Sequence, residues 1–156
     1  MEISVTAHLL EIQKNAPQEL QPFFSLLLQA QRELNQLLTQ ALAVDISLAQ
    51  YPEPNLTAII ADDNAWKTAG ETLPPAERLC DALARVWSVE ALLDKTAQFY
   101  RQSSQNHAHP TERLFFSSLA EIKQLLRRRA SSLNQSLGNQ VWSEVGFSPF
   151  ILAREF

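Results

Sequence analysis

The sequence has little of several features that mark other protein classes. Three glycines among 156 residues are too few for the turn-rich connections of an all-β protein. The single cysteine, Cys80, cannot form an internal disulfide, and its apolar helical neighbourhood leads us to expect a buried thiol. No apolar run approaches the roughly 20 residues of a membrane span. The first five residues lack the basic region of a signal peptide, so we expect a cytoplasmic protein without a membrane partner.

Positive charge is also scarce. Lysine and arginine number 13 against 17 aspartates and glutamates, which gives a net charge of −4 and a pI near 5.4. A general nucleic-acid binder carries a positive electrostatic footprint. Nucleic acid is therefore not expected as a partner.

Helical periodicity is the dominant feature that the sequence does contain. Apolar residues make up 46% of the chain, and they recur every three or four positions over long stretches. A chain of this length forms one domain with a single core, here residues 1–156. The spacing predicts helices at about 3–15, at 18–44, from Pro75 to before Asn106, and from Pro110 to before Gly138.

Two segments break the pattern. Residues 45–73 are too long to join adjacent antiparallel helices, so they predict a crossover between helices two and three, with a short helix at 57–69. Residues 138–156 form an apolar C-terminal tail. An apolar segment of this length is seldom left exposed to water, and we expect it to be buried in a homodimer interface. The aromatic residues assigned to this interface are Trp142, Phe147, Phe150 and Phe156.

The second and fourth predicted helices also repeat a pattern. "PQELQPFFSLLLQAQRELNQLL" from Pro17 and "PTERLFFSSLAEIKQLLRRRAS" from Pro110 share a leading proline, a nearby glutamate and a Phe-Phe-Ser. In addition, "ALARVWSVEALLDKTAQFYRQSS" followed by "HPTERLFFSSLAEIKQLL" resembles the second helix pair of rubrerythrin-type members of the ferritin-like superfamily. The resemblance implies an all-α four-helix bundle whose di-iron site uses glutamates and Glu-x-x-His pairs.

The positions that the resemblance assigns to metal ligands hold other residues here. The glutamate expected before Phe-Tyr is Leu93, and the Glu-x-x-His pair of the last helix is replaced by Lys123 and Leu126. The matching positions of the first repeat are Gln31 and Leu34. Leucines at ligand positions fill the core and remove the need for a metal to offset buried charge. We therefore expect no cofactor and no catalysis, but a bundle that acts through binding or self-association.

One alternative is a rubrerythrin-like or ferritin-like oxidoreductase that binds iron through shifted ligands. Glu90 interrupts an otherwise apolar stripe, and His8 and Glu11 have metal-compatible spacing on the first helix. A further alternative is that the partner is another protein, or a small apolar ligand bound between helices. The residues that could supply shifted iron ligands are Glu90, Glu11, His8, Glu33 and Glu121.

Three consecutive arginines, 127–129, span most of a helical turn and so point in different directions. A phosphate site would need them to converge. Ion pairs with acidic residues on the same or a neighbouring helix are the expected arrangement, given the acidic total charge.

Overall fold

A computed structural model describes residues 1–43 and 58–146, and every regular element in these two ranges is a helix. The predicted all-α class is confirmed. None of the helices in the described ranges has the length and apolar character needed to cross a membrane. In chain order the elements are α1 (Glu2–Asn15), the 3-10 helix η1 (Gln18–Leu20), α2 (Gln21–Ala43), α3 (Ala58–Ala61), α4 (Asp63–Ala69), the 3-10 helix η2 (Ala76–Arg78), α5 (Leu79–Asn106) and α6 (Pro110–Glu144).

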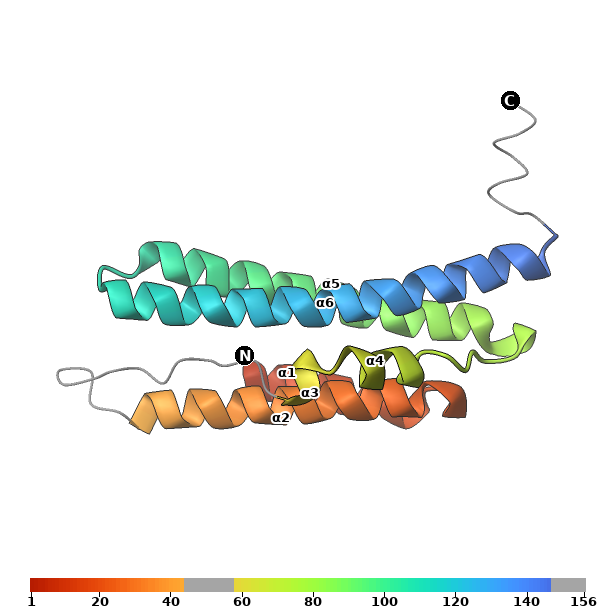
Figure 1. Cartoon of the computed structure of the whole chain (residues 1–156), viewed down its shortest axis with the longest axis horizontal. Coiled ribbons are helices and arrows are strands. Elements are labelled where there is room, and N and C mark those ends of the chain that lie inside the picture. Colours follow the sequence, from red (N-terminus) through yellow and green to blue (C-terminus); the bar gives the residue numbers. More distant parts are fainter. Residues whose placement is uncertain (44–57, 147–156) are drawn as a thin grey trace, which may run out of the picture.

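The long helices stack as two antiparallel pairs (Figure 1). Helices α1 and α2 form one layer, and α5 and α6 form the other. The short helices α3 and α4 pack on α2, and α3 also contacts α6. Because α2 ends at the opposite end of the stack from the start of α5, the connection between them leads from one end to the other (Figure 1).

The apolar stripes face the interior between the two layers. In α1 the inward residues are Val5, Leu9 and Ile12, as the spacing predicts. Leu93 on α5 and Leu126 on α6 both have an exposure of 0%. Full burial of one leucine side chain contributes about 1.5–3 kcal/mol, so these stripes account for the pairing of the layers.

The predicted end of the last helix is wrong. Helix α6 continues past Gly138 to Glu144. A glycine inside a helix costs about 1 kcal/mol, which is less than Leu137 gains by complete burial one residue earlier. The helix stops just before Gly146, whose positive φ of 78° suits a glycine that follows a helix C-terminus.

The predicted tail therefore begins later than residue 138. Trp142 lies on the last turns of α6 and is 49% exposed. Phe147, Phe150 and Phe156, the other residues assigned to a dimer interface, lie outside the described residues.

Two further expectations need correction. Cys80 is exposed rather than buried, because Leu79 takes the inward position and the next residue of a helix points about 100° away. The helix expected at 57–69 is divided into α3 and α4. The division falls at Asp62, whose carboxylate accepts a hydrogen bond from the Ala65 amide at 3.1 Å and so begins a new helix.

Candidate functional site

The interior between the layers contains a group of polar side chains, one from each long helix. Glu2 comes from α1, Gln31 from α2, Tyr100 from α5 and Lys123 from α6. We call these four residues the central cluster. Gln31 and Lys123 have an exposure of 0%, and Tyr100 of 3%. Buried polar groups at the meeting point of four helices are unusual in a core of leucines, so they define the candidate site.

Lys123 lies at the middle of the central cluster. Its ammonium donates hydrogen bonds to Glu2 Oε2 at 3.0 Å and to Gln31 Oε1 at 2.7 Å. The Gln31 amide nitrogen donates to the same Glu2 oxygen, and the Tyr100 hydroxyl donates to Glu2 Oε1. Both carboxylate oxygens of Glu2 thus accept hydrogen bonds, and one of them faces a positive charge.

The hydrogen-bond network extends from the central cluster along α1 and α2. Gln31 Nε2 also donates to Asn35 Oδ1 at 3.2 Å, and Asn35 Nδ2 donates to Thr6 Oγ1 at 3.0 Å. The Thr6 hydroxyl in turn donates to the backbone carbonyl of Glu2 at 3.0 Å. This chain of bonds fixes the orientation of the Gln31 amide, whose oxygen faces Lys123 and whose nitrogen faces Glu2.

The electrostatics of the ion pair follow from its burial. Burial alone would raise the pKa of Glu2, but the Lys123 ammonium and the bonds from Tyr100 and Gln31 outweigh it, so the pKa lies below the ordinary 4.5. Burial lowers the pKa of Lys123, and the Glu2 carboxylate opposes that shift. Loss of the lysine proton would leave the carboxylate buried without a countercharge. We therefore treat the pair as charged at neutral pH.

Tyr100 is held in its protonated form. Burial is the larger cause that raises the pKa of its hydroxyl, and the adjacent Glu2 carboxylate adds to it. The hydroxyl therefore acts as a hydrogen-bond donor throughout the physiological pH range. It is not placed to act as a base.

Gln31 and Lys123 stand at positions that the family resemblance would assign to metal ligands. Gln31 and Lys123 come from the two repeats, and the structure brings their side chains into direct contact. The sequence assigned no role to Tyr100. Glu2 was not expected at all. The signal that could have identified it is its spacing of three and seven residues from Val5 and Leu9, which places it on the inward face of α1.

The residues considered as shifted iron ligands do not converge. His8 and Glu11 on α1 and Glu121 on α6 are exposed, whereas Glu33 on α2 and Glu90 on α5 are half-buried. Across residues 1–43 and 58–146, no three His, Cys, Asp or Glu side chains are grouped so that they could hold a metal ion.

Glu90 has a partner outside the central cluster. Its carboxylate accepts a hydrogen bond at 2.7 Å from the side-chain amide of Asn134 on α6. Glu90 therefore lies at the edge of the stripe that it interrupts, where a carboxylate can remain partly hydrated.

The three consecutive arginines diverge as expected. Arg127 forms an ion pair with Asp94 at 3.5 Å, Arg129 pairs with Asp63, and Arg128 is exposed. They do not form a common anion site.

No protein-family model, curated protein or solved structure matches this chain.

Proposed function

We propose that the protein is a non-catalytic, ferritin-like four-helix bundle in which a buried ion pair replaces a di-iron site, and that it acts through binding or self-association. The observation that supports this proposal most directly is the position of Lys123. Its ammonium lies 3.0 Å from the Glu2 carboxylate and 2.7 Å from the Gln31 amide oxygen, in the interior between the layers.

The charge balance of the central cluster supports a site without a metal. In a di-iron site the metal ions offset the negative charge of the buried glutamates. Here the Lys123 ammonium offsets the carboxylate of Glu2, the acidic member of the central cluster. A cation that entered the same space would meet the ammonium as a like charge and would displace its hydrogen bonds. The network is therefore complete as it stands.

The hydrogen-bonding pattern also argues against catalysis at this position. Each side chain of the central cluster forms a hydrogen bond with another member, so these groups are already engaged within the core. A catalytic acid or base needs access to a reacting group. The cluster serves instead to hold four helices in register.

The alternative function, a di-iron oxidoreductase, would require iron on the candidate residues Glu90, Glu11, His8, Glu33 and Glu121. Three of these side chains are exposed and the other two lie on different helices. No contact among the described residues favours that function over the first.

Self-association is the second part of the proposal. At the end of α6, Trp142 is 49% exposed, and Val145, the residue after the last helical residue, is 59% exposed. Apolar side chains in this position suit an intermolecular surface. We propose that this end of α6, together with Phe147, Phe150 and Phe156, forms a homodimer contact.

Metal content tests the proposal. Protein produced in iron-rich medium should contain far less than one equivalent of iron, manganese or zinc by elemental analysis, and a chelator should leave its melting temperature unchanged. About two metal ions per chain, the content of a di-iron bundle, would contradict it if they disappeared in Glu90→Ala. Glu77→Ala on the exposed surface is the matched control.

A further inference from the structure

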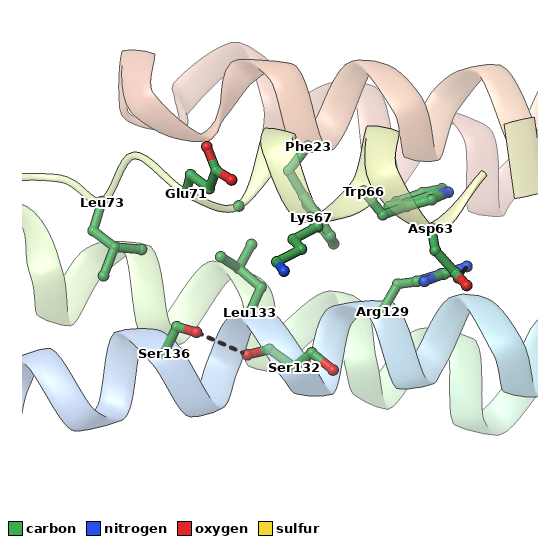
Figure 2. Close-up of a pocket in the computed structure, with 11 residues that line it drawn as sticks. Phe23, Asp63, Trp66, Lys67, Glu71, Leu73, Arg129, Ser132, Leu133 and Ser136 are labelled. Atoms are coloured by element: carbon green, nitrogen blue, oxygen red, sulfur yellow. Dashed lines mark hydrogen bonds and ion pairs between the residues drawn. The ribbon is translucent and has the colours of Figure 1, made fainter.

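A pocket of about 530 Å³ opens between α4 and α6, away from the central cluster. Its volume falls within the roughly 300–1,000 Å³ of small-molecule sites. Figure 2 shows side chains from both helices directed into the space between them. The pocket lies where the short helix α4 covers the side of the stack, so it is independent of the hydrogen bonds that hold the four long helices together.

The walls of the pocket are largely apolar. Phe23 from α2, Trp66 from α4 and Leu133 from α6 are buried and line it, and Leu73 closes one end. The rings of Phe23 and Trp66 meet edge to face with centroids 5.5 Å apart. Such a surface binds the hydrocarbon part of a ligand by removing it from water.

Lys67 supplies a positive charge at the opening. In Figure 2 its side chain extends from α4 toward α6 and ends near Leu133. Among residues 1–43 and 58–146 its ammonium has no ion-pair or hydrogen-bond partner. The Glu71 carboxylate also lines the pocket, but in the same view it points away from α6.

The far side of the pocket offers further donors. Arg129 uses its terminal nitrogen to bind Asp63 and the Ile60 carbonyl, but its buried Nε has no hydrogen-bond partner. The Ser132 and Ser136 side chains line the same wall on α6, where the Ser136 hydroxyl donates a hydrogen bond to the Ser132 backbone carbonyl at 3.3 Å. An unsatisfied buried donor is costly, and a ligand that accepts its hydrogen bond recovers that cost.

We propose that this pocket binds a small amphipathic carboxylate, with its hydrocarbon part against Phe23, Trp66 and Leu133 and its carboxylate at Lys67. This inference rests on the proposed function, because it names a ligand for a protein that acts by binding. An acceptor group fits the donors of the pocket, since Asp63 already pairs with Arg129 and no described carboxylate forms an ion pair with Lys67.

The experiment is a titration of isotope-labelled protein with octanoate, followed by amide and indole NMR shifts. Octanol and octylamine are the comparison ligands, because they have the same hydrocarbon chain with a neutral and a positively charged head group. Octanoate should shift the Gly70 amide and the Trp66 indole, and it should bind roughly tenfold more tightly than octanol, as expected for a hydrogen bond to a charged group. Octylamine should bind most weakly. Equal binding of octanoate and octanol would overturn the proposal.

Three variants locate the site. Lys67→Gln should remove the preference for octanoate over octanol, and Ser136→Leu should block both ligands by filling the pocket. Lys95→Gln is the matched control, because Lys95 is also an exposed helical lysine but lines a separate pocket between α1 and α5. A loss of octanoate binding in Lys95→Gln with none in Lys67→Gln would place the ligand elsewhere and refute the assignment.

Failure of this inference can be told apart from failure of the proposed function. If octanoate shows no preference but the protein contains no metal, the pocket assignment is wrong and the non-catalytic bundle stands. If stoichiometric metal is found and disappears in Glu90→Ala, the proposed function fails whatever the outcome of the titration.

Discussion

Removal of the Lys123 ammonium is the perturbation that tests the central cluster most directly. Lys123→Met keeps an unbranched side chain of similar length but leaves Glu2 without its countercharge. The side chains of Lys123 and Glu2 are only 1% and 11% exposed, so water cannot replace the lost partner without opening the helices. Removal of one partner of a buried ion pair lowers the free energy of unfolding by about 3–5 kcal/mol. Because Glu2 lies at the start of α1 and local fraying can hydrate it, we expect the lower end, about 3 kcal/mol.

The measured quantity is the free energy of unfolding in urea, with circular dichroism as the probe of helix content. For a chain of this size a loss of about 3 kcal/mol corresponds to a fall in melting temperature of roughly 6–12 °C. The double variant Glu2→Gln with Lys123→Met removes both charges, and it should regain most of the loss, because a neutral replacement of a buried pair is often close to neutral in stability. The free energies of the two single variants and the double variant form a double-mutant cycle.

The pH dependence of the stability of the same variants is an independent test of the ion pair. In the wild type the pKa of Glu2 is lowered, so its contribution to stability is present above pH 4.5 and is lost as the pH falls below that value. In Lys123→Met burial should raise the pKa of Glu2, and acidification toward pH 4.5 should then stabilise the variant relative to the wild type. A loss below about 1 kcal/mol in Lys123→Met, or additive effects in the double variant, would refute the buried ion pair.

Three further predictions concern other parts of the molecule. Leu126→Ala should destabilise by about 2–5 kcal/mol through lost burial and a cavity, and a urea midpoint near that of the wild type would contradict the assigned register. Deletion of residues 142–156 should convert a dimer into a soluble monomer in light scattering, whereas a full-length protein that is monomeric at high micromolar concentration would refute the interface. The Glu2→Gln, Lys123→Met double variant should exchange its α1 amide hydrogens faster than the wild type at equal global stability; unchanged exchange would show that the pair does not hold α1.

The helices and their inward faces could be predicted from the sequence because both depend on local periodicity. Val5, Leu93 and Leu126 recur at helical spacing with their neighbours, and burial follows that spacing. The end of α6 could not be predicted in this way. Gly138 is a local stop signal, but the packing of Leu137 outweighs it. The exposure of Cys80 was missed because a difference of one residue decides which face a helical side chain takes.

The candidate site could be predicted only in part. The repeat and the family resemblance drew attention to Gln31 and Lys123, but not to the hydrogen bond between them. Glu2 contacts a residue 121 positions away in the sequence, and no periodic pattern records such a pairing. A glutamate in the first turn of a helix is also a common surface feature, since it interacts favourably with the helix dipole. The pocket between α4 and α6 depends on where the chain returns after the crossover, which sequence spacing does not specify.

The position of Glu2 explains why a costly ion pair could be retained in a core that leucine could fill. Helix α1 is the shortest of the four long helices, and only three of its residues are buried and apolar. Three contacts of this kind would also be satisfied if the helix shifted by one turn. The Glu2 carboxylate receives hydrogen bonds from α2, α5 and α6 at once, and any such shift would leave it and Lys123 buried without partners. We propose that the pair contributes to specificity, because it penalises a one-turn shift of α1 that the apolar stripe alone would allow.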